Sequence, residues 1–176
     1  VRNKGAFSEY IDTLQERIDQ NNQIGFAISV FDCNNLKQIN DQYGHDKGDE
    51  YLKNASSLIC HVFRHSPVFR IGGDEFAAIL ENDDFENRDA LVKEFEDKQK
   101  ESQARAEAAW DEVHVAMGIA VYDAAQDHTV NDTVYNNAPC DDFVAKGVFG
   151  ADTNQTGQPV FPSEWFILDF VLIGIV

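Results

Sequence analysis

The stretch that most constrains the fold is residues 69–80, where two apolar, β-prone runs are joined by two glycines and two acids. Gly72-Gly73 between such runs predicts a β-hairpin, because glycine accepts the positive φ angles of a tight two-residue turn. The turn would hold Asp74 and Glu75 on a rigid tip and would let a bulky anionic ligand approach the backbone. Taken alone, this pattern is more often an ordinary surface hairpin.

Composition limits the kind of protein and partner. With 176 residues and 43% apolar content, the chain is expected to form one domain with its own core. The formal charge of −17 argues against nucleic acid and against anionic membrane surfaces as partners, and no direct membrane insertion is expected. An anionic nucleotide would need local help from a divalent metal, helix N-termini or a few placed cations.

Cysteine usage indicates a reducing compartment. The three cysteines are odd in number and form no C-x-x-C pair, so neither a disulfide framework nor a zinc site is expected. No secretory signal opens the sequence. We therefore expect a cytoplasmic location, either for a free protein or for the cytoplasmic part of a membrane-anchored one.

Hydrophobic periodicity predicts alternating helices and strands. The predicted order is a helix (1–22), a strand (26–32), two helices (36–42 and 49–63), the hairpin (69–80), a helix (86–110) and a strand (114–121). Ser8 is expected to cap the first helix, and Asn34 or Asn35 the second. This order predicts an α/β (α+β) sandwich with a mixed, mainly antiparallel sheet flanked by helices.

Two motifs resemble one known family. Residues 72–76 read Gly-Gly-Asp-Glu-Phe, and residues 32–49 resemble the pattern D-x-D-x-F-K-x-I-N-D-x-[YF]-G-H-x-x-G-D. Together they resemble the GGDEF family of diguanylate cyclases, over roughly residues 1–133. The resemblance implies a palm-like sheet with the signature on its hairpin. The opening residues resemble the end of the family's N-[RK]-x-x-F motif, so we expect that the chain is excised from a longer protein.

The resemblance also implies a metal site. Asp32 and Asp74 would bind Mg²⁺, or Mn²⁺ in its place, through their carboxylates, and Cys33 would bind through its main-chain carbonyl. Asp74 and Glu75 would be the catalytic acids, with Glu75 assisting deprotonation of the attacking hydroxyl. Taken alone, Asp32 could merely end a strand.

Substrate-binding residues are implied in the same way. Lys37 and the main-chain N–H groups of residues 34–37, including Asn35 and Leu36, would hold the β- and γ-phosphates. Asn40 and Asp49 would read the guanine, because a carboxylate accepts from guanine N1–H and N2–H₂. Taken singly, Asn40 and Asp49 are as typical of helix caps, and Lys37 of a solvated surface.

The implied activity is condensation of two GTP molecules into cyclic di-GMP, with release of two pyrophosphates. It would need a homodimer, because each protomer supplies half of the site, and an upstream sensor or dimerising region. The alternative from the same motifs is a catalytically weak or inactive domain that binds GTP as a regulatory module. Cyclase chemistry on another purine nucleotide stays open.

Four departures from the family pattern bear on activity. Asn34 replaces a common second aspartate, and Asn35-Leu36 replaces the usual aromatic residue before the lysine. Many diguanylate cyclases carry an R-x-x-D product-inhibition motif five residues before the signature. Residues 63–66 occupy that window here and lack both charged residues in register, so tight feedback binding of cyclic di-GMP is not expected. The family's closing helix is not recognisable in residues 134–176, which form an atypical segment where Lys146 is a weak candidate for the phosphate-binding lysine. Its apolar end, 165–176, is too short to span a bilayer comfortably.

Overall fold

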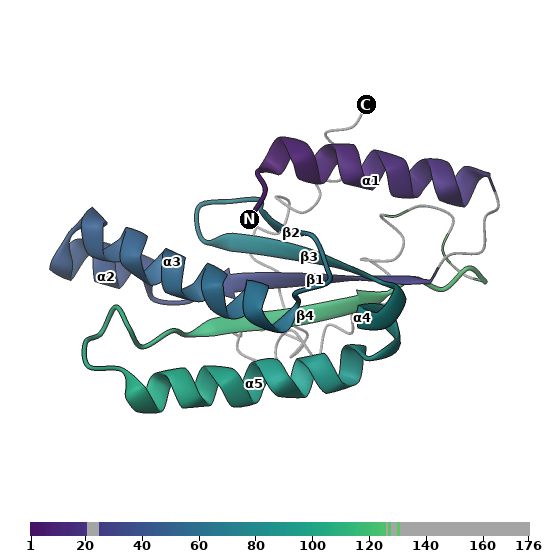
Figure 1. Cartoon of the computed structure of the whole chain (residues 1–176). Coiled ribbons are helices and arrows are strands. Elements are labelled where there is room, and N and C mark those ends of the chain that lie inside the picture. Colours follow the sequence, from purple (N-terminus) through teal and green to yellow (C-terminus); the bar gives the residue numbers. More distant parts are fainter. Residues whose placement is uncertain (21–24, 126, 128–129, 131–176) are drawn as a thin grey trace, which may run out of the picture.

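The computed structural model describes residues 1–20, 25–125, 127 and 130, and these form a sheet flanked by helices (Figure 1). The elements are α1 (Lys4–Asp19), β1 (Phe26–Cys33), α2 (Leu36–Tyr43), α3 (His45–Val62), β2 (Val68–Arg70), β3 (Glu75–Glu81), α4 (Asn82–Glu86), α5 (Arg88–Arg105) and β4 (Val115–Val121). The predicted order is confirmed, with α4 as an addition where a loop was expected. The segment 134–176, including Lys146, lies outside the described residues.

The sheet has the order β2-β3-β1-β4, so β1 and β3 are its central strands. In the described part of the chain every pairing between these strands is antiparallel, and one parallel bridge joins Arg2 to Phe69. The predicted fold class is therefore confirmed, with the glycine-acid signature on the β2–β3 hairpin. None of the described helices has the length and apolar character needed to cross a bilayer.

Strand alternation divides the core into two layers. Phe26 and Ile28 of β1 pack with α1, whose buried face includes Phe7 and Leu14. Phe31, on the other side of β1, packs in the second cluster with residues of α3 and α5. Figure 1 shows α1 on one side of the sheet and α5 on the other. Burial on both faces explains why 26–31 is a continuous apolar run with one serine.

Helix boundaries differ from the predicted ones for local reasons. Asn3, not Ser8, caps α1, because its Oδ1 accepts from the N–H of Ala6 at 3.0 Å. The α3 helix begins at His45 rather than at residue 49, because Gly44, with φ 89°, turns the chain within one residue. The α5 helix ends at Arg105 rather than at residue 110.

Chain 106–114, which follows α5, packs against the α2–α3 corner. The Trp110 ring meets Tyr43 edge-on, with 5.2 Å between ring centroids, and the Lys47 ammonium lies 4.3 Å from the Trp110 centroid. The segment that follows the early end of α5 thus makes a tertiary contact that helical periodicity does not contain.

The hairpin is confirmed, but its predicted two-residue turn is wrong. β2 ends at Arg70 and β3 begins at Glu75, so the connection is a loop of residues 71–74, and neither glycine has a left-handed φ. The N–H groups of Ile71 and Gly72 both donate to the carbonyl of Glu75. The Arg70 guanidinium donates to the carbonyls of Gly72 and Gly73, which holds the wider loop closed.

Candidate functional site

The end of β1 meets the start of β3 at the acidic signature. Asp32 lies directly opposite Glu75 in the antiparallel register. Directly opposed residues project to the same face of a sheet, with Cβ atoms about 4.5–5.5 Å apart. The next residue along, Cys33, donates its N–H to the carbonyl of Asp74 at 3.0 Å. Sheet pairing thus brings together three acids from two distant motifs.

Asp74 precedes β3, so strand alternation does not fix the direction of its side chain. The location of the Asp74 carboxylate can be inferred from its effect on Cys33. The thiol of Cys33 is buried with 1% exposure. Burial chiefly, and then the negative charges of Asp32 and Asp74, raise the pKa of this thiol to about 12. Both carboxylates therefore lie near Cys33.

The donors at this strand end suit a hard divalent cation. Asp32 and Asp74 offer carboxylate oxygens, and Cys33 offers a main-chain carbonyl, which are the ligands that Mg²⁺ prefers. The protonated thiol of Cys33 would be a poor ligand for it. Among the residues described, no cluster of three or more His, Cys, Asp or Glu side chains suits a metal. A site here would therefore depend on two carboxylates, the carbonyl and oxygens of the substrate.

The two glycines of the loop have different surroundings. A Cβ on Gly72 would lie 2.1 Å from Oε2 of Glu75 and 3.0 Å from its Cδ. A Cβ on Gly73 would meet no described atom within 4 Å. The carboxylate of Glu75 therefore folds over Gly72, and glycine at 72 is what leaves room for it.

The β1–α2 connection holds the predicted phosphate-binding residues. Asn35 occupies the N-cap position of α2 with left-handed backbone angles (φ 69°, ψ 3°), but its side chain makes no capping hydrogen bond in the described structure. The N–H of Asn34 donates to the carbonyl of His114 at 2.8 Å, so this N–H is already engaged. The N–H groups beginning at Leu36 open the helix and have no intrahelical acceptor by geometry. Lys37, exposed, stands in that first turn.

The two predicted guanine readers lie on adjoining helix ends. Asn40 is on α2, and Asp49 is in the second turn of α3. A Cβ on Gly48 would lie 1.9 Å from Oδ1 of Asn40, so the Asn40 amide rests on the backbone of α3 beside Asp49. The structure thus brings the Asn40 side chain to the residue that precedes Asp49.

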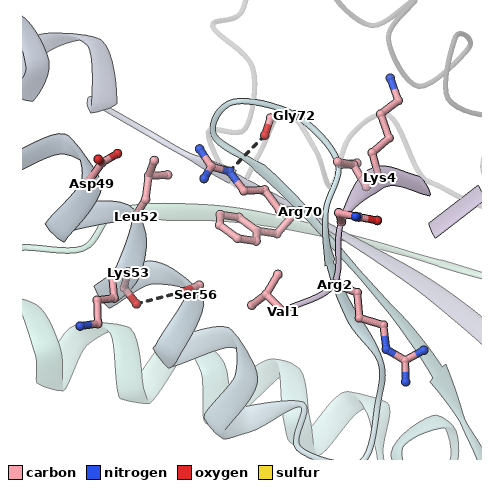
Figure 2. A pocket seen from close by; sticks show the side chains of 12 residues that line it. Val1, Arg2, Lys4, Asp49, Leu52, Lys53, Ser56, Arg70 and Gly72 are labelled. Atoms are coloured by element: carbon pink, nitrogen blue, oxygen red, sulfur yellow. Dashed lines mark hydrogen bonds between the residues drawn. The ribbon is translucent and has the colours of Figure 1, made fainter. Parts of the chain in front are cut away.

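A cavity of about 710 Å³ opens between α3, the hairpin and the N-terminal segment (Figure 2). Asp49 and Leu52 line its α3 side, and Arg70 and Gly72 line its hairpin side. Figure 2 shows the Arg70 guanidinium turned back toward Gly72, and Val1 between Ser56 and Arg2. The cavity therefore joins the predicted base-reading end of α3 to the glycine of the signature loop.

The remaining predicted feature concerns product feedback. Phe63 stands at the first position of the 63–66 window, and its ring is fully buried against Phe31 with 5.3 Å between centroids. This position is part of the core and offers no cation to a ligand. Sequence reasoning missed Arg70, whose place beside the signature could have indicated its role, and Tyr51, whose contacts need the tertiary structure.

Comparison with known proteins gives one family. The family model described as "Diguanylate cyclase, GGDEF domain" matches residues 1–138. The diguanylate cyclase DgcS of Shewanella oneidensis is 40% identical over 80 residues, which is 45% of this chain and 27% of that protein. The cyclic di-GMP phosphodiesterase PdeR of Escherichia coli is 37% identical over 81 residues, 46% of this chain and 12% of that protein. The chain thus spans about a quarter or less of these relatives.

Solved structures share the fold. The GGDEF domain of DgcB from Caulobacter crescentus, in complex with c-di-GMP, superposes with a TM-score of 0.64 at 21% identity. The match covers 83% of this chain and 85% of that one. At this identity the similarity establishes the palm-like α/β architecture.

Proposed function

The chain belongs to the GGDEF domain family of diguanylate cyclases, and from that premise we propose that it condenses two GTP molecules into cyclic di-GMP. One molecule of GTP would bind to each protomer of a homodimer, and two pyrophosphates would leave. The observation that carries the proposal is the pairing of Asp32 with Glu75, with the Asp74 carbonyl bonded to the N–H of the next residue, Cys33. Gly72, in the same loop as Asp74, lines a cavity of about 710 Å³.

Guanine would be read at the α2–α3 end of the site. The Asp49 carboxylate accepts from N1–H and N2–H₂, and the Asn40 amide contacts the base edge. Adenine offers neither donor pattern, so it would leave a desolvated carboxylate unpaired. Leu52 supplies an apolar wall of the cavity.

The triphosphate would lie at the start of α2. Lys37 and the N–H groups from Leu36 onward supply positive charge and donors at a helix N-terminus. Mg²⁺, held by Asp32, Asp74 and the Cys33 carbonyl, would neutralise phosphate charge. These contacts matter because a chain with a formal charge of −17 repels GTP at long range.

Glu75 would act as the base. It would accept the proton of the 3′-hydroxyl of GTP while that oxygen forms a bond to the α-phosphorus of the partner's GTP. The bond from the α-phosphorus to the bridging oxygen breaks, and pyrophosphate carries away that electron pair. The second, symmetric transfer closes the ring. Gly72 leaves the space in which the Glu75 carboxylate sits.

The full-length context is part of the proposal. An upstream sensor or dimerising region would bring two domains face to face in the cytoplasm, because one domain supplies half of the reacting pair. Nucleic acid is not an expected partner of so acidic a chain.

The direct test incubates the 176-residue chain with GTP and Mg²⁺ at a series of protein concentrations. We expect pyrophosphate and cyclic di-GMP at a 2:1 ratio, with a rate per protomer that rises with concentration because a dimer must form. ATP should give no product. Absence of pyrophosphate even at high protein concentration would contradict the cyclase assignment.

A second function has specific support. The chain is also similar to PdeR, a protein named for phosphodiesterase activity, and the family's closing phosphate-binding helix is not recognisable after residue 133. Both favour a domain that binds GTP and regulates a neighbour without turnover. Calorimetry separates the two functions: Mg²⁺-dependent GTP binding without product supports the regulatory module, and Asp74→Ala should abolish that binding in either case.

A further inference from the structure

Tyr51 is a buried side chain of α3 whose hydroxyl reaches two other segments. The residue is 0% exposed. Its Oη donates to the carbonyl of Asn34 at 2.6 Å and accepts from the N–H of His114 at 2.9 Å. The carbonyl of His114 also lies 2.9 Å from the hydroxyl. One phenol therefore links α3 to the β1–α2 turn and to the start of β4.

Both polar groups of the Asn34 backbone are hydrogen-bonded. Its N–H donates to His114 at 2.8 Å, and its carbonyl accepts from Tyr51. The next residue, Asn35, has left-handed backbone angles, which cost a non-glycine residue free energy unless the surroundings fix them. Burial raises the pKa of Tyr51, so the hydroxyl keeps the proton that it donates.

The fixed turn leads directly into the proposed phosphate site. Asn35 is followed by Leu36 and Lys37, the first residues of α2. Tyr51 also lies two residues after Asp49, in the same helix as the proposed guanine reader. The hydroxyl therefore links the phosphate-binding turn to the helix that would hold the base, and a shift of either segment would displace the other.

We propose that Tyr51 is a positioning residue whose hydroxyl sets the Asn34–Asn35 turn for binding of the substrate triphosphate. The inference rests on the proposed GTP site, which it extends by a residue that does not touch the nucleotide. A phenylalanine at this position would fill the core equally well, so packing alone does not account for the hydroxyl. Its loss would leave the Asn34 carbonyl and the His114 N–H without this partner in a part-buried place.

The test compares Tyr51→Phe with Tyr10→Phe in the whole chain. Tyr10 is a matched control, because its hydroxyl donates to Glu81, which lies at the end of β3 away from the signature loop. Calorimetry with Mg²⁺ measures the affinity for GTP and for GMP, which lacks the β- and γ-phosphates. We expect Tyr51→Phe to weaken GTP about 3- to 10-fold and to leave GMP within about 2-fold, from the usual net worth of one hydrogen bond.

Amide hydrogen exchange supplies a readout independent of the nucleotide. The Asn34 N–H should exchange faster in Tyr51→Phe than in the unmodified chain or in Tyr10→Phe. Should Tyr51→Phe fail to fold, Tyr51→Met removes the hydroxyl with a flexible side chain and carries the same expectations.

The outcomes separate the inference from the proposed function. An unmodified chain that binds no GTP would overturn both. GTP binding that is equal in the unmodified chain and in Tyr51→Phe would overturn this inference alone. A matching loss of GTP and GMP affinity would do the same, because it would mark a structural role without any preference for the triphosphate.

Discussion

Asn40 and Gly48 are in such close contact that a single methyl group on Gly48 would lie 1.9 Å from Oδ1 of Asn40. Gly48 is buried inside α3, where alanine is ordinarily the better helix former by roughly 0.5–1 kcal/mol. The position therefore has a local preference for alanine and a tertiary requirement for glycine.

Gly48→Ala should weaken GTP binding about 10-fold or more, because the Asn40 amide must leave the place from which it would read guanine. The melting temperature should change little, since gained helix propensity offsets the cost of moving one side chain. Calorimetry and thermal unfolding measure the two effects. Gly5→Ala in α1 is the control, as its Cβ would lie an ordinary 3.5 Å from Asn3. Unchanged affinity for GTP in Gly48→Ala would contradict the assignment of Asn40 to the guanine site.

Gly72→Ala and Gly73→Ala form a matched pair in the signature loop. Alanine at 72 displaces the Glu75 carboxylate, whereas alanine at 73 points into open space. We expect Gly72→Ala to lower kcat by about 10²-fold or more, the usual scale for loss of a general base, with an affinity for GTP within about 3-fold. Gly73→Ala should retain most activity. Equal loss in both variants would show that the loop requires glycine for another reason.

Removal of the cation or of its carboxylates should abolish tight GTP binding. With EDTA in place of Mg²⁺, or with Asp32→Asn or Asp74→Asn, the triphosphate would meet an acidic chain without charge neutralisation. We expect at least about a 100-fold weaker affinity by calorimetry, which is about 2.7 kcal/mol. Asp83→Asn, an exposed acid in α4, is the charge-matched control. Metal-independent GTP binding would contradict the assignment of Asp32 and Asp74.

Alkaline pH should destabilise the fold through Cys33. Its folded pKa is raised from 9.0 to about 12, chiefly by burial, so above pH 9 the unfolded chain releases a proton that the folded chain retains. The contribution is fully present below pH 9 and is lost as pH rises toward 12, at up to about 1.4 kcal/mol per pH unit. Urea unfolding at pH 8–11 should show this decline, and Cys33→Ala should reduce the slope. Parallel pH profiles for the two proteins would refute this account.

The order of elements follows from local pattern. Neighbouring residues carry the signals for the apolar runs at 26–32 and 114–121 and for the helical spacing of α1 and α3. These signals can therefore be recognised without knowledge of the fold. The hairpin was predicted for the right residues but with the wrong turn. The Arg70 side chain closes a wider loop by donating to the carbonyls of Gly72 and Gly73. Turn propensities of single residues do not include such a side-chain contact.

Site residues divide in the same way. Two motifs predict Asp32, Asp74, Glu75, Asn40 and Asp49 as site residues, and a motif needs no coordinates. Which of them meet was decided by the antiparallel register: it sets Glu75, rather than Asp74, directly opposite Asp32. Register is a property of two strands whose paired residues lie far apart in the sequence, 75 − 32 = 43 positions for Asp32 and Glu75, so it cannot be derived from either strand alone.

The amino-acid sequence by itself determined the family, the order of elements and the acids available for chemistry, because each depends on residue types at fixed spacing along the chain. The tertiary structure alone answers which side chains Gly48 and Gly72 leave room for, where the chain after α5 packs and what the Tyr51 hydroxyl bonds to. Each of these answers depends on an atom from another element arriving within a few ångströms. Close packing between distant segments creates such constraints. The sequence around one residue does not indicate which distant residue will pack against it.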